Sequence, residues 1–467
     1  MTAKIKLLIP LAVVFLVNYS MGQEALTMTK ALQLGLNNYG VIKSKAFQVE
    51  SSRNSLSQAR RDYVPNVVLG AQQVYGTVNG QNGPLYGFGG FAVSSSGLPL
   101  PEQNWNAGFG ALYLANFNWE VFSFGRARGR IRVADAAMNT AEGDLEQEQF
   151  QHQVRVAAAY LNALGSGRVT KAQQKNLERA QVIQRDIVAR TKGGLRPGVD
   201  SAFANAEVAA AKIALLRAAD IQQEQEQNLA FLIGVNYRDI QLDTSFVAGI
   251  PVVPGNDTTS RAGNNHPTVN LFQRRVDQSL QQLKLGKSSY YPSINLVGIF
   301  QTRASGFAQT YAQDQSRYTN SYSSGVKPTI SNYLVGVGLT WNLATIYRTN
   351  AQVQALKYNS LAMEADLQLT RDQLKTQLEI ADAKLVRALQ IKEQVPIQVS
   401  SAVDAYMQRS TLYKSGLSNL VDITQAMYLL NRAESDRDLA YINVWQALLL
   451  KAAATGDLSL FTNQLSR

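Results

Sequence analysis

The sequence predicts a mainly α fold with a transmembrane β-barrel, in which two homologous halves each supply two strands and long coiled-coil helices. Three observations predict this class: an internal repeat, strands that are apolar on one face only, and helical stretches far longer than those of ordinary globular domains. The repeat is considered first because it determines how every local pattern should be interpreted.

The repeat is visible when the second half of the chain is laid over the first. The matching positions, first half against second, are Tyr63 with Tyr290, Pro65 with Pro292, Trp119 with Trp341, Asp200 with Asp422, and Gly234 with Gly456. Only one loop, between the proline and the tryptophan, differs in length. The copies are too long for solenoid units. We therefore predict one pseudo-symmetric domain with a first repeat at 23–240, a linker at 241–262 and a second repeat at 263–467.

The N-terminus has the pattern of a secretory signal peptide over residues 1–22. Lys4 and Lys6 precede an apolar run from Leu7 to Val17, and the small residues of Ser20-Met21-Gly22 follow where a signal peptidase cleaves. The run is too short to span about 30 Å of hydrocarbon. The chain has no Cys, which excludes disulfides, thiolate metal sites and a lipid-modified cysteine. Its net charge of +11 is dispersed, which argues against nucleic-acid binding.

The first half begins with a predicted helix over 25–61. Pro65 ends this helical region because the residue before a proline disfavours the helical conformation. A strand over 64–78, a loop over 79–104 rich in Gly, Ser and Pro, and a second strand over 106–124 follow. The second half repeats this order, with its long loop predicted over 302–331.

The strands are apolar on one face and mostly small and polar on the other, because side chains two residues apart share a face. The apolar positions are Phe109, Ala111, Tyr113, Ala115, Phe117, Trp119 and Val121 in the first half, and Tyr333, Val335, Val337, Leu339, Trp341 and Leu343 in the second. This pattern fits a barrel wall with lipid outside and water inside. From the strands alone a soluble sandwich is the alternative; the signal peptide and the long loops favour the barrel.

Each half ends in a predicted helical hairpin. The stretch 126–192 has no proline and would extend roughly 100 Å as a helix. Its copy, 348–414, contains Pro396, which is predicted to kink it. Partner helices over 199–233 and 420–454 carry apolar residues at spacings of three and four, as coiled coils do. The tips of the two hairpins should lie near Leu195 and Leu417.

A sheet of four strands has two unpaired edges, whose backbone groups would be unsatisfied in a membrane. The sheet must therefore close with copies of itself, with eight strands for two copies and twelve for three. The long loops should lie outside the cell, and the helices should form a tube in the periplasm.

The chain resembles the TolC family of outer-membrane efflux proteins over nearly all of its mature length. The resemblance is carried by the Ala31-Leu32…Asn37-Asn38 opening, the Ala59-Arg60-Arg61-Asp62-Tyr63-Val64-Pro65 junction, the Phe117-Asn118-Trp119-Glu120 strand, and the doubled turns Gly194-Leu195…Val199-Asp200 and Gly416-Leu417…Val421-Asp422-Ile423. It implies a trimer with a 12-stranded barrel and a periplasmic α-helical tunnel, in the cell outer membrane of a Gram-negative bacterium. It also implies a porin-like exit duct of a tripartite efflux or type I secretion system, without catalysis or cofactor. The partners implied are a periplasmic adaptor (a membrane fusion protein) and an inner-membrane RND or ABC transporter.

Two sets of residues are candidates for function. Asp200 and Asp422 follow the two hairpin turns, where an acid near a helix start favours the helix dipole and can cap the helix. Three copies would instead place a ring of acids at the tunnel end, and rings of charge select ions. The resemblance adds a periplasmic gate at these positions, with Tyr413 and Arg196 as further candidates.

The second set is the tip pairs Gly194-Leu195 and Gly416-Leu417. Each glycine can supply a left-handed helix cap. The resemblance also implies that the adaptor docks there, tip to tip, and the two roles are compatible.

Other functional classes fit less well. His152 and His266 have no partner at ligand spacing, so no zinc site is expected, and Gly87-Phe88-Gly89-Gly90 lacks the strand–helix context of a phosphate loop. A secreted coiled-coil structural or adhesion protein would explain the helices but not the strands that end in tryptophan. A substrate-binding module is disfavoured because no stretch resembles the lining of a closed apolar pocket. The exported substrate and the transporter class are left open.

Overall fold

The computed structural model describes residues 25–80, 97–194, 197–237, 241–249, 251 and 265–465, so the expected signal peptide lies outside the described residues. The chain divides into two compact units. The helical unit comprises Met1–Ser44, Glu146–Thr268 and Arg371–Arg467, and the sheet unit comprises Lys45–Leu145 and Val269–Thr370. Each unit takes residues from both halves of the sequence. The two halves are therefore interleaved, and the mainly helical class with one small sheet is confirmed.

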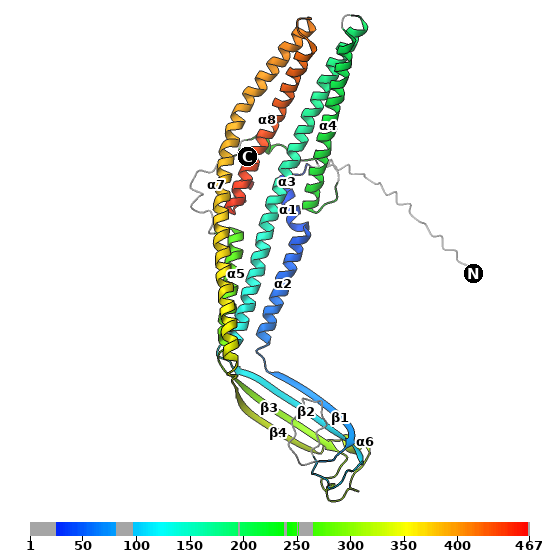
Figure 1. The fold of residues 1–467 in the computed structure, drawn as a ribbon, viewed down its shortest axis with the longest axis vertical. Helices are drawn as coiled ribbons and strands as arrows, with labels where there is room; N and C mark the ends of the chain where they lie inside the picture. Colours follow the sequence, from blue (N-terminus) through cyan, green and yellow to red (C-terminus); the bar gives the residue numbers. More distant parts are fainter. Residues whose placement is uncertain are drawn as a thin grey trace, which may run out of the picture. The chain divides into compact units, whose positions relative to one another are not determined.

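The sheet unit contains one antiparallel sheet in the order β1-β2-β3-β4. The strands are β1 (Asn66–Thr77), β2 (Ala107–Phe122), β3 (Ser293–Ser305) and β4 (Ile330–Thr340), which lie side by side in Figure 1. The helical segments of this unit belong to α2 (Gly40–Arg61), α3 (Arg126–Lys192), α5 (Pro267–Ser288), α6 (Tyr322–Val326) and α7 (Thr345–Lys414). β1 and β4 have no strand partner on their outer edges among the described residues.

The register places the two predicted apolar faces on one side of the sheet. Phe117 lies opposite Val67 on β1 and Gly298 on β3, and Gly298 lies opposite Val335 on β4. Residues directly opposite one another share a face. The large side chains of this face on β4 are exposed: Tyr333, Val335, Val337 and Leu339. One side of the sheet is therefore an apolar surface that the chain itself leaves largely uncovered.

The loop between β3 and β4 is shorter than predicted. β3 continues to Ser305 and β4 begins at Ile330, so the ends of the predicted 302–331 loop belong to strands. The short helix α6 lies inside the segment and packs against β2 and β3. Tyr113 Oη donates a hydrogen bond to the Val326 carbonyl oxygen at 3.2 Å. The density of Gly and Ser suggested a loop, whereas tertiary contacts order part of it.

The repeat recurs in the contacts where helix changes to strand. Trp119 Nε1 donates to the Tyr63 carbonyl oxygen at 2.9 Å, and Trp341 Nε1 donates to the Tyr290 carbonyl oxygen at 3.2 Å. Both tryptophans and both tyrosines are repeat partners in the sequence. Each indole thus satisfies a backbone carbonyl just before the proline that ends the helical region.

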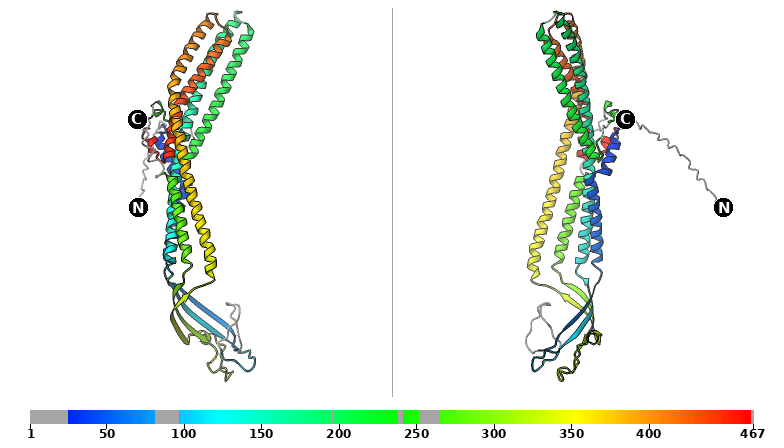
Figure 2. Two further views of the ribbon diagram at one scale, coloured as in Figure 1. Left: turned by 60° about the vertical axis from the view of Figure 1, so that its left-hand side comes forward. Right: turned by 90° about the vertical axis from the view of Figure 1, so that its right-hand side faces the viewer.

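The helical unit contains α1 (Met28–Asn38), α4 (Gly198–Ile233), α8 (Leu420–Thr455), the 3-10 helix η1 (Phe246–Ala248) and α9 (Ser459–Thr462), together with segments of α3 and α7. Two antiparallel hairpins, α3 with α4 and α7 with α8, are visible in Figures 1 and 2. The lengths of all four long helices agree with the predictions to within a few residues. Pro396 lies inside α7, which continues as one helix through it.

The predicted helix over 25–61 is wrong in one respect, because it is two helices. α1 ends at Asn38, and Tyr39, in extended conformation, separates it from α2. Asn38 packs against Gly234 at the end of α4 and donates a hydrogen bond from Nδ2 to the Ile233 carbonyl oxygen at 3.3 Å. Gly40 begins α2 directly after the break, and the long-range contact holds the last residue of α1 against the end of α4.

The main core of the helical unit surrounds Tyr160 and Trp445, which are nearly inaccessible to solvent. Tyr160 Oη donates to the carbonyl oxygens of Leu26 and Asp243, at 2.6 and 3.1 Å. Burial raises the pKa of this phenol. The contact attaches the segment before α1 and the segment after α4 to α3. Within the described residues, none of the helices is long and apolar enough to cross a membrane.

Candidate functional site at the hairpin tips

The two hairpins of the helical unit are joined to each other near their tips. Tyr413 of α7 is 2% exposed and packs with Ile187 of α3, Ala204 of α4, and Leu420 and Ile423 of α8. All four long helices thus contribute to one small cluster. Ala204 is small enough to permit close approach of α4, and the tyrosine ring is buried among the branched apolar side chains.

Polar contacts reinforce this junction. Arg179 of α3 donates from Nη2 and Nη1 to the two carboxylate oxygens of Glu434 of α8, at 2.8 and 3.3 Å, and both side chains are less than one-fifth exposed. Arg190 donates to the Lys414 carbonyl oxygen at 3.2 Å. A two-pronged arginine–carboxylate pair of low exposure is stronger and more directional than an ordinary surface ion pair.

The tip glycines have the left-handed backbone that the sequence predicts. Gly194 has φ of 73° and Gly416 has φ of 77°, a region that residues with a Cβ disfavour. At the second tip, Gly416 N donates to the Tyr413 carbonyl oxygen at 3.1 Å and Leu417 N to the Leu412 carbonyl oxygen at 2.9 Å. This pair of bonds is a Schellman motif, which satisfies the last carbonyls of α7. Both glycines therefore end helices, as predicted from their ability to supply a left-handed helix cap.

Asp422 is held in place by three neighbours. Its backbone N–H donates to Asn419 Oδ1 at 2.8 Å, its Oδ2 accepts from Ser418 Oγ at 2.9 Å, and Arg409 of α7 lies 3.6 Å from the same oxygen. The N-cap of α8 is therefore Asn419, and the interpretation of Asp422 as the capping residue is wrong. The carboxylate lies in the first turn, where it still favours the helix dipole.

Asp200 occupies the matching position on α4, but its surroundings differ. The N-cap of α4 is Pro197, which makes no side-chain hydrogen bond, and Asp200 N donates to the Pro197 carbonyl oxygen at 3.1 Å. Asp200 itself is half-buried in the first turn. Whether the Asp200 side chain caps α4 therefore stays a prediction. Leu195 and Arg196, predicted at this tip, lie outside the described residues.

The structure packs Tyr413 against Ala204, which lies one helical turn after Asp200 on α4, and against Ile423, which directly follows Asp422 on α8. It adds Arg179, Arg190 and Arg409, which sequence analysis missed. Arg179 and Glu434 are 255 residues apart, so no local pattern could have paired them. The tip also exposes apolar side chains, with Leu417 at 77% and Val421 at 61%.

The two histidines are buried and bind helix ends. His152 Nε2 donates to the Leu232 carbonyl oxygen and His266 Nε2 to the Ala453 carbonyl oxygen, each at 3.0 Å, near the C-termini of α4 and α8. Burial lowers the pKa of both imidazoles. The described residues contain no group of three or more potential metal-ligating side chains.

Comparison with known proteins gives one family. The family model described as "Outer membrane efflux protein" matches residues 31–235 and 258–449, one segment in each half. No curated protein sequence is matched.

Solved structures of outer-membrane channels have a similar fold. The CmeC outer membrane channel of Campylobacter jejuni superposes with a TM-score of 0.73 at 15% identity, covering 92% of this chain and 85% of that one. VceC of Vibrio cholerae gives 0.72 at 15% identity, with coverages of 92% and 96%. The MtrE outer membrane channel of Neisseria gonorrhoeae, in its open state, gives 0.70 at 16% identity, with coverages of 92% and 89%. At these identities the likeness establishes the fold.

Proposed function

Because this chain belongs to the outer membrane efflux protein family and serves as an efflux duct of the outer membrane, we propose that three copies assemble into one 12-stranded barrel continued by a periplasmic α-helical tunnel. The duct would complete a tripartite efflux or type I secretion system with a periplasmic adaptor and an inner-membrane RND or ABC transporter. Energy for transport would come from that transporter. The family match favours this function over a secreted coiled-coil structural or adhesion protein.

The open edges of the sheet carry this proposal. β1 and β4 are the outer strands of a 4-stranded antiparallel sheet, and they run antiparallel to each other. β4 of one copy can therefore pair with β1 of the next in the same antiparallel sense. The exposed apolar face of β4 would then face lipid, and every edge would be satisfied.

Cysteine cross-linking tests whether the edge strands of neighbouring copies pair. The native chain has no Cys, so no native cysteine can form a competing disulfide. We expect a chain carrying both Gln72→Cys on β1 and Gly336→Cys on β4 to form disulfide-linked dimers and trimers on mild oxidation in outer membranes. Both positions lie near the middle of an edge strand, on the same face of the sheet. Two further pairs, in which Val68→Cys or Gly76→Cys takes the place of Gln72→Cys, allow for a different register between β4 and the neighbouring β1.

The control combines Gly336→Cys with Asn116→Cys, because Asn116 lies on the interior strand β2. This pair should give no disulfide-linked dimers or trimers. A chain that runs as a monodisperse monomer in mild detergent with its full strand and helix content, and that forms no such cross-linked products in any register, would contradict the barrel.

The hairpin tips are the proposed docking site of the adaptor. The proposed docking residues are Gly194, Leu195, Gly416 and Leu417, and the exposed Leu417 and Val421 side chains support an apolar contact at the second tip. The proposed periplasmic gate consists of Asp200, Asp422, Tyr413 and Arg196 beside these tips. The ion pair of Asp422 with Arg409 and the buried Tyr413 support a gate held by contacts between helices.

The orientation of the duct is tested by labelling. A peptide tag inserted at Gln81-Asn82-Gly83, in the proposed extracellular loop, is expected to be labelled on intact cells. A tag at Arg196 should be labelled only after the outer membrane is permeabilised. Both sites lie outside the described residues. Labelling of the Arg196 tag but not of the loop tag on intact cells would contradict the proposed orientation.

A further inference from the structure

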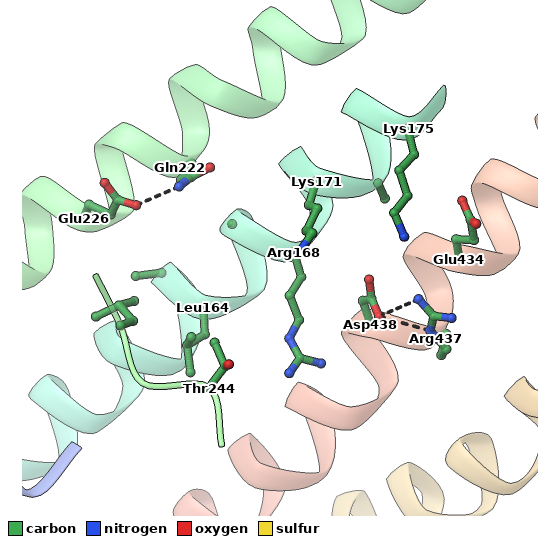
Figure 3. Close-up of a pocket in the computed structure, with 14 residues that line it drawn as sticks. Leu164, Arg168, Lys171, Lys175, Gln222, Glu226, Thr244, Glu434, Arg437 and Asp438 are labelled. Carbon is green, nitrogen blue, oxygen red and sulfur yellow. Dashed lines mark hydrogen bonds and ion pairs between the residues drawn. The ribbon is translucent and has the colours of Figure 1, made fainter. Parts of the chain in front are cut away.

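The helical unit contains a charged cavity of about 430 Å³ on α3, away from the tip turns. Small and apolar residues of α3 form part of its lining, among them Ala163 and Gly167. Its walls come from α4, α8 and the segment after α4. Figure 3 shows the side chains of Arg168 and Lys175 extending from α3 toward α8.

The acidic and basic side chains of this cavity differ in how they are satisfied. Glu434 pairs with Arg179, Asp438 pairs with Arg437 at 3.1 Å, and Glu226 accepts from Gln222 Nε2 at 2.8 Å. All three acids thus have a partner.

Three basic side chains of α3 that line the cavity have none. Arg168, Lys171 and Lys175 make no hydrogen bond or ion pair among the residues that the structure describes. They are spaced three and four residues apart on one helix face. Like charges at these spacings repel and destabilise a helix by a few tenths of a kcal/mol per pair. A bound anion would remove this repulsion.

We propose that this cavity binds a small oxyanion with two or more negative charges, of the phosphate-ester or polyphosphate class. Arg168 supplies a planar guanidinium that can bind two phosphate oxygens at once, and the two lysines supply point charges beside it. Thr244 also lines the cavity, and its hydroxyl can act as a further donor. The volume is in the lower range of small-molecule sites, which excludes large ligands.

The second large cavity of the helical unit provides the contrast. It lies on the other side of α3, has about 650 Å³, and is lined mainly by apolar and amide side chains with Arg217 as its single charge. It lacks the row of cations, so an anion should prefer the first cavity.

Titration calorimetry of the purified full-length protein with inorganic pyrophosphate at low ionic strength tests the site. We expect saturable binding with one site per chain. Replacing Arg168 and Lys171 together by glutamine should weaken binding at least about tenfold, a loss of about 1.4 kcal/mol. Raising the salt concentration should weaken binding of the wild-type protein as well.

The matched control replaces Arg217 and Lys212 by glutamine, which removes the same charge from the helical unit outside the cavity. Its affinity should equal that of the wild type. Circular dichroism would establish that both double variants keep their helix content. Absence of saturable binding to the wild type, or an equal loss in the control, would overturn the proposal.

A further titration with mixed micelles containing phosphatidylglycerol separates two sources of the phosphate group. If the micelles do not compete with pyrophosphate for binding, the natural ligand is a soluble anion. Competition by the micelles that depends on Arg168 and Lys171 would identify a lipid head group as the source of the same phosphate chemistry.

Discussion

Replacing Asp200 and Asp422 together by alanine is expected to change the cation selectivity of the channel and to raise its resting conductance, with the trimer intact. In the proposed trimer, the change would remove the proposed ring of carboxylates at the tunnel end. Charges in a low-dielectric constriction are weakly screened, so the effect on permeation should be large. The change also removes the contact between Asp422 and Arg409, which joins the two helices of a hairpin. Planar bilayer recordings with cation gradients measure both quantities.

The structure supplies a control that separates gating from helix capping. Asn419, not Asp422, caps α8 through its side chain. Asn419→Ala should therefore lower stability by about 1 kcal/mol without changing selectivity, because no charge is lost. If the double aspartate variant has wild-type currents and only a lower melting temperature, as Asn419→Ala should, the two acids contribute to stability alone and the gate must be sought elsewhere.

Replacing Gly456 by alanine is expected to destabilise the helical unit strongly, by about 3 kcal/mol. Gly456 ends α8 with φ of 77°, and a Cβ there would lie 2.8 Å from the Cα of His266. The left-handed backbone costs about 1 kcal/mol for a residue with a Cβ. Overpacking against a fixed backbone adds about 2 kcal/mol. Thermal unfolding followed by circular dichroism, together with the yield of trimer, measures the loss.

Gly416→Ala is the matched control for this prediction. Gly416 has the same φ of 77°, but nothing lies within 4 Å of a Cβ built on it. It should lose only the backbone contribution, about 1 kcal/mol. Equal melting temperatures for the two variants would show that the neighbouring backbone at His266 yields, and that the close approach has no energetic consequence. Gly234, whose added Cβ would lie 2.6 Å from Asn38 Cβ, should behave like Gly456.

Features set by local periodicity were predictable from the sequence. The bounds of α3 follow from a long proline-free stretch that begins after the second strand, and the structure has the same bounds. The apolar faces of β2 and β4 follow from alternation, and the register puts them on one side of the sheet. The glycines at 194, 234, 416 and 456 end helices because a left-handed residue is needed there. These properties depend on each residue's near neighbours.

Features that depend on distant segments were decided by the tertiary structure. Asn38, just before the break at Tyr39, contacts the end of α4, and the pairing of Arg179 with Glu434 joins two hairpins. Asn and Asp are both suitable N-cap residues, so the residue type does not decide between Asn419 and Asp422. The structure shows that the Asn419 side chain accepts from a free backbone N–H at the start of α8. The sequence alone determined the two-half organisation, the four long helices and the tip glycines of this efflux duct. Which side chains meet across the helices depends on long-range packing, because periodicity specifies the face of a helix and not its partner.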